Sequence, residues 1–317
     1  MILFIAEHSN GKLKKSALEL ANAASGLAEK LGESVVAAII GADVSAASEL
    51  SNYVSQVYAV ENADLADIRA ESYATVVTGL AKDLDAKVLM LSASKSGLSY
   101  SPRVAVRLDA PLLEDVISLD VEDGQVVAKR FSYLSRVTET VKANSLPVVI
   151  SVKPNIFPVA EASGTGNIEA KSVNLSDNDL RVTIAEKSEA VGGRVALEEA
   201  SVVIAGGRGM GDDGFSSLIE PMADLLNAGI GATRAVVDAG WRPYNEQIGQ
   251  TGKTVSPDLY FAFGLSGAVQ HLSGMNRSKY IVAVNKDADA PIFKASDYGI
   301  VGDVNVVLPE LLKALKS

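Results

Sequence analysis

The sequence predicts an α/β protein made of two doubly wound domains with mainly parallel sheets. Short runs of β-branched and aliphatic residues alternate with alanine-rich segments of helical spacing. Most of these runs are apolar throughout, which is typical of strands buried on both faces. The length of 317 residues, at ~150 residues per domain, favours two domains. Residues 154–187 are polar and rich in glycine, serine and asparagine, so we place the boundary after them, between domains of residues 1–189 and 190–317.

The N-terminal half begins with an apolar strand at residues 2–7, and the helix that follows is expected to end at Gly32. Further strands are expected at 34–40, 56–60, 87–91 and 147–152, with a helix at 75–84. Between residues 114 and 132 the pattern changes to that of a β-hairpin, with Asp123 and Gly124 in its turn.

The C-terminal half repeats the alternation of strands and helices. Strands are expected at 200–207, 232–238, 258–264, 279–286 and 298–303, and helices after 214, after 266 and at 308–316. In parallel α/β sheets, ligands bind on loops at the carboxyl ends of strands. The loops of this half are therefore the first places to look for a binding site.

Composition limits the chemistry that the chain can perform. Cysteine is absent and histidine occurs only as His8 and His271, so disulfides, thiolate nucleophiles and cysteine-rich metal sites are excluded. Any redox chemistry would need a cofactor. The net charge of −10 argues against a nucleic-acid partner. No apolar run reaches the ~18 residues of a membrane span, and the first apolar run precedes the basic residues, the reverse of a signal peptide. We therefore expect a cytoplasmic protein.

The loop GGRGMGDDG, residues 206–214, formally contains the dinucleotide-binding pattern G-x-G-x-x-G. Asp212 and Asp213 would repel a pyrophosphate at this place, and they are better suited to capping the next helix. Arg208 is a candidate for binding an anion, and the alternative is a tight turn with a surface arginine.

A second loop carries Thr233 and Arg234 between glycines and an apolar run. An arginine here can lie against a planar ring or a phosphate, or it can be an ordinary surface residue. In a third loop, Ser266-Gly267 opens a predicted helix that contains Gln270 and His271. Backbone N–H groups at such a start suit an anion, whereas His271 can equally make an ordinary hydrogen bond.

Asn285 and Asp303 follow the last two predicted strands. An acid at a strand end often binds ribose hydroxyls, and both residue types also form turns. Together the four loops favour a ligand that combines phosphate groups with a ring, bound along one edge of the second sheet.

The segment IGQTGKTV, residues 248–255, resembles a phosphate-binding P-loop without matching it. Gln247 stands where the pattern needs its first glycine, and the preceding residues are polar rather than strand-like. Lys253 with Thr254 would still suit an anionic or polar ligand, so the role of the segment stays open at this point.

The combination GGRGMG, GATRAVVDAGW, QIGQTGKTVSPDLYFAFGLSGAVQHLSGM, KYIVAVNKDADAPIF and DYGIVGD closely resembles the FAD-binding domain of the electron transfer flavoprotein alpha subunit. The order and spacing of these motifs hold over nearly all of residues 200–317. The first half is similar more loosely, through residues 92–119, where Ser101 before Pro102 would be a plausible helix start.

The resemblance implies that the C-terminal domain is a Rossmann-like FAD-binding domain. The residues expected to line the phosphates and the ring are Arg208, Thr233, Ser266, Gly267, Ala268, Val269, Gln270 and His271. Those expected at the adenosine end are Asn285, Asp303 and Val304. Ile248 and Gly249 belong to the same set, on the loop that brings Gln250 and Thr251 to the flavin edge around N5 and O4.

No residue is expected to act as a catalytic acid or base, and no metal is expected. Three candidates would instead tune the flavin. Arg234 would lie near the ring, and a cationic or hydrogen-bond-donating His271 would lie near O2; both would favour negative charge on the N1–O2 side. Thr251 would hydrogen-bond N5.

The resemblance further implies an electron carrier rather than an enzyme, and a heterodimer with a beta subunit that holds AMP. Its donors would be flavoprotein dehydrogenases such as the acyl-CoA dehydrogenases of fatty acid oxidation, and its acceptor a membrane quinone oxidoreductase. The alternative within the family is an NADH-dependent bifurcating complex with a second FAD in the beta subunit. A non-redox nucleotide-binding protein is the alternative outside it. The N-terminal domain is expected to be a scaffold that contacts the other subunit.

Overall fold

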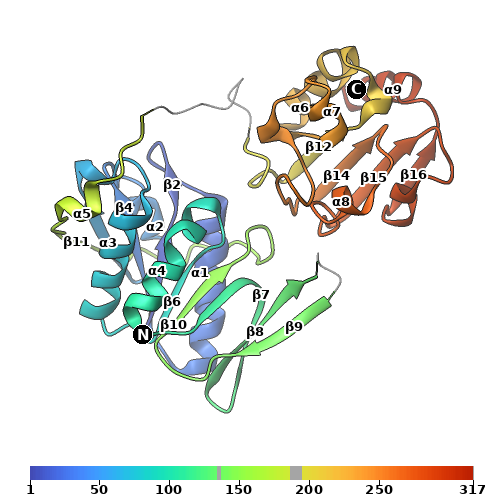
Figure 1. Cartoon of the computed structure of the whole chain (residues 1–317). Helices are drawn as coiled ribbons and strands as arrows, with labels where there is room; N and C mark the ends of the chain where they lie inside the picture. The colour runs from blue at the N-terminus through green and yellow to red at the C-terminus, as the bar shows by residue number, and fades with distance from the viewer. Residues whose placement is uncertain (134–136, 186–194, 317) are drawn as a thin grey trace. The chain divides into compact units, whose positions relative to one another are not determined.

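The computed structural model describes residues 1–133, 137–185 and 195–316 (Figure 1). These residues divide into two compact units, 1–187 and 188–317. The boundary expected between residues 189 and 190 lies outside the described residues. Each unit is an α/β structure, as predicted, and each is described here by itself.

The first unit is a nine-stranded sheet with helices on both faces. Its strands are β1 (Ile2–Ala6), β4 (Val35–Gly41), β5 (Gln56–Glu61), β6 (Val88–Ser92), β7 (Leu112–Glu122), β8 (Gln125–Ser132), β9 (Val137–Lys142), β10 (Val148–Val152) and β11 (Asn167–Ala170), beside a small hairpin of β2 (His8–Ser9) and β3 (Lys12–Leu13). Its helices are α1 (Lys15–Leu31), α2 (Ala47–Leu50), η1 (Ala63–Leu65), α3 (Ala70–Asp83), α4 (Lys95–Leu108) and α5 (Asp177–Leu180).

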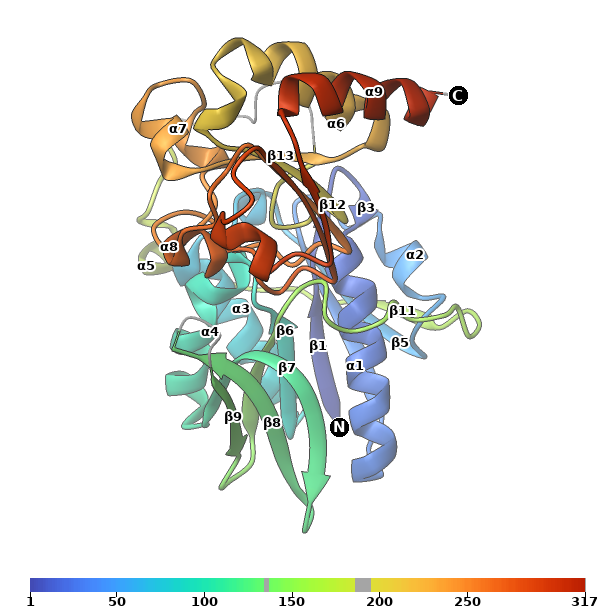
Figure 2. The same ribbon diagram turned by 90° about the vertical axis from the view of Figure 1, so that its right-hand side faces the viewer.

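The order of the first sheet is β11-β5-β4-β1-β6-β10-β7-β8-β9. The strands from β11 to β7 run parallel, and only the pairs β7–β8 and β8–β9 are antiparallel. Helix α1 packs on one face and α3 with α4 on the other, as Figure 2 shows for α1 and α3 on opposite sides of β1. The prediction of a doubly wound, mainly parallel sheet is confirmed, including the β7–β8 hairpin turning at Asp123 and Gly124.

The second unit has a five-stranded, wholly parallel sheet. Its strands are β12 (Val202–Gly206), β13 (Gly229–Ala232), β14 (Leu259–Phe263), β15 (Tyr280–Asn285) and β16 (Tyr298–Val301). Its helices are η2 (Arg208–Met210), the π-helix η3 (Phe215–Ile219), α6 (Glu220–Leu226), α7 (Arg234–Asp238), η4 (Tyr244–Glu246), α8 (Val269–Leu272), η5 (Pro291–Lys294) and α9 (Val304–Lys316). The strand order is β13-β12-β14-β15-β16.

Alternation along the strands divides the second core between the two faces of the sheet. Phe261 and Phe263 pack with η3, α6 and α9, whereas Tyr260 and Ala262 face Ile248, Val255 and the segments around α8. Figure 1 shows α6, α7 and α9 on one side of this sheet and α8 on the other. This period-two division is what a strand buried on both faces requires.

Two expectations about local structure are wrong. The strand predicted at 232–238 lies earlier, at β13, and Arg234 begins helix α7. A Cβ at Gly231 would lie 2.3 Å from Ile248 Cδ1, so this strand needs glycine where propensity would favour β-branched residues. The polar stretch of residues 154–187 contains one further strand, the exposed β11, which pairs in parallel with β5.

The second wrong expectation concerns Ser101. Helix α4 begins at Lys95, and Ser94 is its N-cap, accepting a hydrogen bond from the Gly97 backbone N–H at 3.0 Å. Pro102 lies inside the helix, and Ser101 is fully buried. The earlier serine is the cap because its hydroxyl satisfies a backbone N–H that the first turn leaves unpaired.

Two glycines in helices of the first unit should respond in opposite ways to alanine. Gly26 is exposed on α1 with no atom within 4 Å of an added Cβ, so Gly26→Ala should raise the free energy of unfolding by ~0.5–1 kcal/mol. A Cβ at Gly97 would lie 2.0 Å from the Ser92 carbonyl oxygen, so Gly97→Ala should lower it by ~1–3 kcal/mol. Urea unfolding followed by far-ultraviolet circular dichroism measures both, and equal stability of the two variants would contradict the prediction.

Candidate functional site

The second sheet reverses its winding at β12. From β12 the chain passes to β13 on one side and then to β14 on the other, so a crevice is expected where β12 and β14 end. Arg208, Thr233, Ser266, Asn285 and Asp303 all follow the carboxyl ends of strands in this parallel sheet. The structure therefore brings the four predicted loops to one edge.

Two glycine-rich loops meet at this edge through their backbones. The Gly209 N–H donates to the Gly264 carbonyl oxygen at 2.9 Å, and a Cβ at Gly207 would lie 2.4 Å from the same oxygen. Gly264 itself has a φ of 59°, in the left-handed region that favours glycine. Gly209 of this contact is exposed, whereas Gly207 is buried, so a ligand can reach the main chain at Gly209.

The two arginines of the edge have different surroundings. Arg208 is exposed in η2, and in the described ranges no hydrogen bond or ion pair is recorded for its guanidinium. Arg234 Nε lies 3.3 Å from Asp238 Oδ2, with both side chains more than 60% exposed, and such a surface pair contributes little. Thr233 precedes α7 at the N-cap position, but its side chain makes no capping hydrogen bond. The two cations and the threonine hydroxyl can all turn to a ligand.

The loop of residues 247–253 is closed on itself and fastened to α8. The Lys253 N–H donates to the Gln247 carbonyl oxygen at 2.7 Å, and the Gln250 N–H donates to the Gln270 carbonyl oxygen at 2.7 Å. Gly249 has a φ of 138°, and a Cβ there would lie 2.7 Å from that Gln270 oxygen. The loop is held by its backbone, and the side chains of Gln250 and Thr251 are exposed.

Lys253, the residue that suggested a P-loop, is already paired. Its Nζ lies 2.8 Å from Glu198 Oε2, and its side chain is only 17% exposed. No helix begins after this loop in the described structure, since residues 254–258 lead into β14. The segment therefore lacks both the available cation and the strand-to-helix context that a triphosphate requires.

His271 is buried, with both ring nitrogens in hydrogen bonds. Nδ1 lies 3.1 Å from the Ile248 carbonyl oxygen, and Nε2 lies 2.9 Å from the Tyr260 hydroxyl. Since a carbonyl only accepts, the proton is on Nδ1, and Tyr260 donates to Nε2. Burial lowers the pKa of His271 to about 4 and raises that of Tyr260 well above its usual value. His271 is thus neutral at pH 7 in this structure, and of the two expected forms, cationic or hydrogen-bond-donating, its Nδ1–H corresponds to the donor.

The helix expected to open at Ser266-Gly267 begins later, because α8 starts at Val269 and has only four residues. Gly267 has a φ of 77°, and a Cβ there would lie 2.4 Å from the Ile292 nitrogen, so the turn is specific for glycine. The side chains of Ser266, Ala268, Val269 and Gln270 are exposed.

The side chains expected at the adenosine end make local contacts. Asn285 Nδ2 donates to the Leu265 carbonyl oxygen at 2.8 Å, which links the loop after β15 to the loop after β14. Asp303 Oδ1 accepts from the Asn305 N–H at 2.8 Å at the start of α9. Val304 is buried, so only its backbone can meet a ligand. The turn-forming alternative for Asn285 and Asp303 thus describes part of what they do.

Two residues of this region were missed by sequence reasoning as functional candidates. Gln247 was considered only as a missing P-loop glycine, yet its side chain is buried and reaches Thr251. Tyr260 reads as one apolar strand residue among many. Because side chains alternate along a strand, Tyr260 must face the side of the sheet opposite to Phe261, which is the side where Ile248 packs. The alternation does not show that Tyr260 contacts His271.

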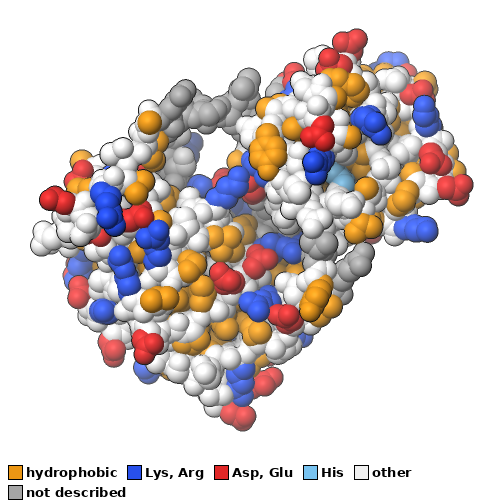
Figure 3. Space-filling view, in the orientation of Figure 1, with side chains coloured by type: hydrophobic (Ala, Val, Ile, Leu, Met, Phe, Trp, Pro, Cys, Tyr) orange, Lys and Arg blue, Asp and Glu red, His pale blue; other side chains and the backbone are white. Residues whose placement is uncertain are grey.

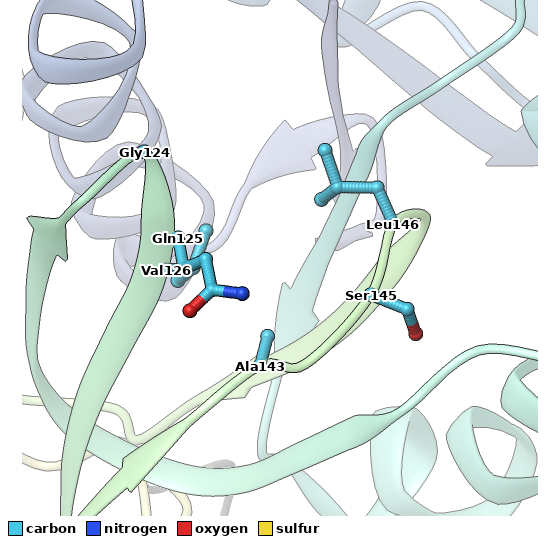
Figure 4. A pocket seen from close by; sticks show the side chains of 6 residues that line it. All are labelled: Gly124, Gln125, Val126, Ala143, Ser145 and Leu146. Atoms are coloured by element: carbon cyan, nitrogen blue, oxygen red, sulfur yellow. The ribbon is translucent and has the colours of Figure 1, made fainter.

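A hollow in the first unit is lined by Gly124, Gln125, Val126, Ala143, Ser145 and Leu146 and contains no ionisable side chain (Figure 4). Within the described ranges, no cluster of three or more His, Asp or Glu residues could hold a metal ion. On the face drawn in Figure 3, basic and acidic side chains are interspersed. None of the described helices combines the length and apolar character needed to cross a membrane.

The buried His271 should make the second unit sensitive to acid. Above the unfolded-state pKa of ~6.5 the histidine is neutral in both states, so its contribution to stability is complete. As the pH falls from ~6.5 to about 4, the unfolded state binds the proton first, and about 3 kcal/mol of unfolding free energy is lost. Fluorescence of Trp241, the only tryptophan, reports unfolding of this unit between pH 7 and 4.

The matched control for this pH dependence is His271→Gln, which has no titrating ring. Subtracting its pH profile from that of the wild type removes the contribution of the carboxyl groups. The prediction fails if the two profiles run parallel between pH 6.5 and 4.

Comparison with known proteins agrees with this geometry. Residues 2–178 match the Electron transfer flavoprotein domain, and residues 196–276 match the Electron transfer flavoprotein FAD-binding domain. The second range contains every predicted cofactor residue up to His271.

Curated relatives align over essentially the whole chain. Electron transfer flavoprotein subunit alpha of Thermoanaerobacterium thermosaccharolyticum is 40% identical, covering 100% of this chain and 98% of that protein. Protein FixB of Clostridium saccharobutylicum is 37% identical, with 98% and 95% covered. The Bacillus subtilis electron transfer flavoprotein subunit alpha is 38% identical, with 100% and 97% covered. Two of these names describe electron transfer, in agreement with a carrier rather than an enzyme. The chain belongs to the electron transfer flavoprotein alpha-subunit family.

Proposed function

We propose that this chain binds FAD on its second unit and, with a beta subunit, carries electrons from flavoprotein dehydrogenases to a membrane quinone oxidoreductase. Acyl-CoA dehydrogenases of fatty acid oxidation are the proposed donors, and the cytoplasm is the proposed location. The observation that carries the proposal is the match to an FAD-binding domain on a unit whose ligand edge combines bare backbone with an available arginine.

The residues of this edge fit a dinucleotide with a charged diphosphate. Gly209, which donates a hydrogen bond to the Gly264 carbonyl oxygen, is exposed next to the ends of β12 and β14. Arg208 supplies a cation beside it, and the guanidinium can hold phosphate oxygens in a bidentate manner. The exposed residues Ser266, Ala268, Val269 and Gln270 extend the edge into the start of α8.

At the adenosine end, the proposed contacts come from groups that are already oriented. Asn285 is fixed by its hydrogen bond to Leu265, and the Asp303 carboxylate, which accepts one hydrogen bond from Asn305, keeps further acceptor capacity for hydroxyl groups. The backbone of Val304 completes this end.

Bound FAD would supply the one- and two-electron redox chemistry that no side chain of the chain can supply. The protein's part is to bind the ring and set its surroundings. Arg234 can exchange its exposed partner Asp238 for the ring and favour negative charge there. Gln250 and Thr251 extend from the rigid loop toward the same ligand.

His271 contributes differently from what sequence reasoning suggested. It is neutral, and its Nδ1–H already serves the Ile248 carbonyl. We propose that His271 supports the loop of residues 247–253, the loop proposed to face the flavin ring, through the Ile248 carbonyl oxygen. To donate a hydrogen bond to a flavin oxygen, His271 must give up one of its two present hydrogen bonds. The first unit is proposed to be the scaffold that contacts the beta subunit, which holds AMP.

The test of the function is the visible spectrum of the chain co-purified with its beta subunit. We expect a flavin spectrum from one FAD on the alpha subunit. An acyl-CoA dehydrogenase with its substrate should reduce this FAD. Retention of ATP instead of FAD would favour the non-redox alternative, and a colourless complex that FAD does not reconstitute would reject the proposal. Reduction by NADH, with a second FAD in the beta subunit, would favour the bifurcating alternative.

Arg208→Ala should weaken FAD binding by about 10- to 100-fold, because it removes a charge-assisted hydrogen bond of ~1.5–3 kcal/mol. Fluorescence titration of FAD into the flavin-depleted heterodimer measures the dissociation constant. The control is Lys313→Ala, which removes an exposed cation from α9, where it pairs only with Glu310. Equal affinities of the two variants would remove Arg208 from the proposed site.

A further inference from the structure

Gln247 begins the loop of residues 247–253, which is proposed to face the flavin ring, and its buried side chain contacts Thr251 of the same loop. It is 3% exposed, and its Nε2 donates a hydrogen bond to Thr251 Oγ1 at 3.0 Å. The chain reverses tightly between the two residues, and a Cβ at Gly252 would lie 2.3 Å from the Gln247 carbonyl oxygen. The contact is therefore built into the loop rather than made by two mobile surface groups.

The direction of this hydrogen bond determines where the Thr251 proton points. A hydroxyl has one proton and two acceptor positions, whereas an amide nitrogen can only donate. Since Gln247 Nε2 occupies one acceptor position of Oγ1, the single proton of Thr251 must point away from Gln247. Thr251 is exposed, so the proton is directed out of the protein toward whatever binds there.

The backbone of Thr251 is held independently of its side chain. The Tyr244 hydroxyl donates to the Thr251 carbonyl oxygen at 2.6 Å, and the next residue back, Gln250, is fastened to α8 through its N–H. The hydroxyl thus keeps a fixed position as well as a fixed direction. A donor held in this way binds an acceptor atom without a further cost of orienting it.

We propose that Gln247 is a positioning residue that makes the Thr251 hydroxyl an obligatory hydrogen-bond donor to an acceptor nitrogen on the edge of the bound flavin ring. This inference rests on the proposed function and adds a residue that acts only through another. Gln247 does not touch the ligand, so its effect on the flavin must disappear when the Thr251 hydroxyl is absent.

The experiment compares three variants in the heterodimer with its flavin. Gln247→Met keeps the volume and removes the donor. Gln247→Glu keeps the shape, but its carboxylate accepts from Thr251 and draws the proton inward. Thr251→Val removes the hydroxyl itself. Asn245→Asp is the control, since it adds the same charge as Gln247→Glu at an exposed position two residues away.

The readout is the ratio of oxidised to reduced FAD at equilibrium with a redox dye of known potential, measured by absorbance. Gln247→Met and Thr251→Val should shift this ratio in the same direction by about two- to tenfold, the effect of one hydrogen bond. Gln247→Glu should shift it at least as far, and Asn245→Asp should leave it within about twofold of wild type. In the Thr251→Val background, Gln247→Met should add no further shift.

Trp241 fluorescence and the FAD content establish that each variant is folded and loaded, and Gln247→Glu decides the question if Gln247→Met does not fold. The inference is overturned by an unchanged ratio in the Gln247 variants, by an unchanged ratio in Thr251→Val, or by an equal Gln247→Met shift with and without the Thr251 hydroxyl. A wild-type heterodimer without FAD would overturn the proposed function and this inference together, whereas an FAD-loaded wild type with any of the other outcomes overturns the inference alone.

Discussion

The contact between the backbones at Gly207–Gly209 and Gly264 is the constraint on which the candidate site depends. Parallel strands β12 and β14 end side by side, and their outgoing loops can meet only if neither carries a Cβ at the point of contact. The contact lies where the winding of the sheet reverses, and Arg208 emerges from the same short turn.

The loop of residues 247–253 shows a second kind of order, in which buried groups hold a segment whose Gln250 and Thr251 side chains stay exposed. His271 holds the Ile248 carbonyl, Tyr260 holds His271, and the Gln250 N–H is bound to α8. A loop fixed by its backbone and by buried neighbours loses little further entropy when a ligand binds. The buried, neutral His271 serves the same purpose, because its two ring nitrogens join Tyr260 of β14 to Ile248 of a loop that lacks regular secondary structure.

Pairing decides which cations are available to a ligand. Lys253 and Arg208 both stand on glycine-rich loops of the second unit, and sequence alone makes Lys253 the more suggestive of phosphate binding. Lys253 is neutralised by Glu198, which lies more than fifty positions earlier in the chain, whereas no ion pair of Arg208 is recorded among the described residues. Motif spacing contains no information about such a partner, because the partner is brought in by the packing of residues 195–200 against the sheet.

Apolar periodicity and glycine positions are local properties, so they were enough to predict the α/β class, the parallel strands, the β7–β8 hairpin and the loops at the carboxyl ends of the second sheet. Motif order likewise carried the family resemblance. Packing between distant parts of the chain was needed to establish that β13 is the glycine segment, that Ser94 rather than Ser101 caps α4, that His271 is neutral and that Gln247 donates to the Thr251 hydroxyl. Each of these depends on atoms from distant parts of the chain, and burial, pKa and the direction of a hydrogen bond exist only once those atoms are packed together.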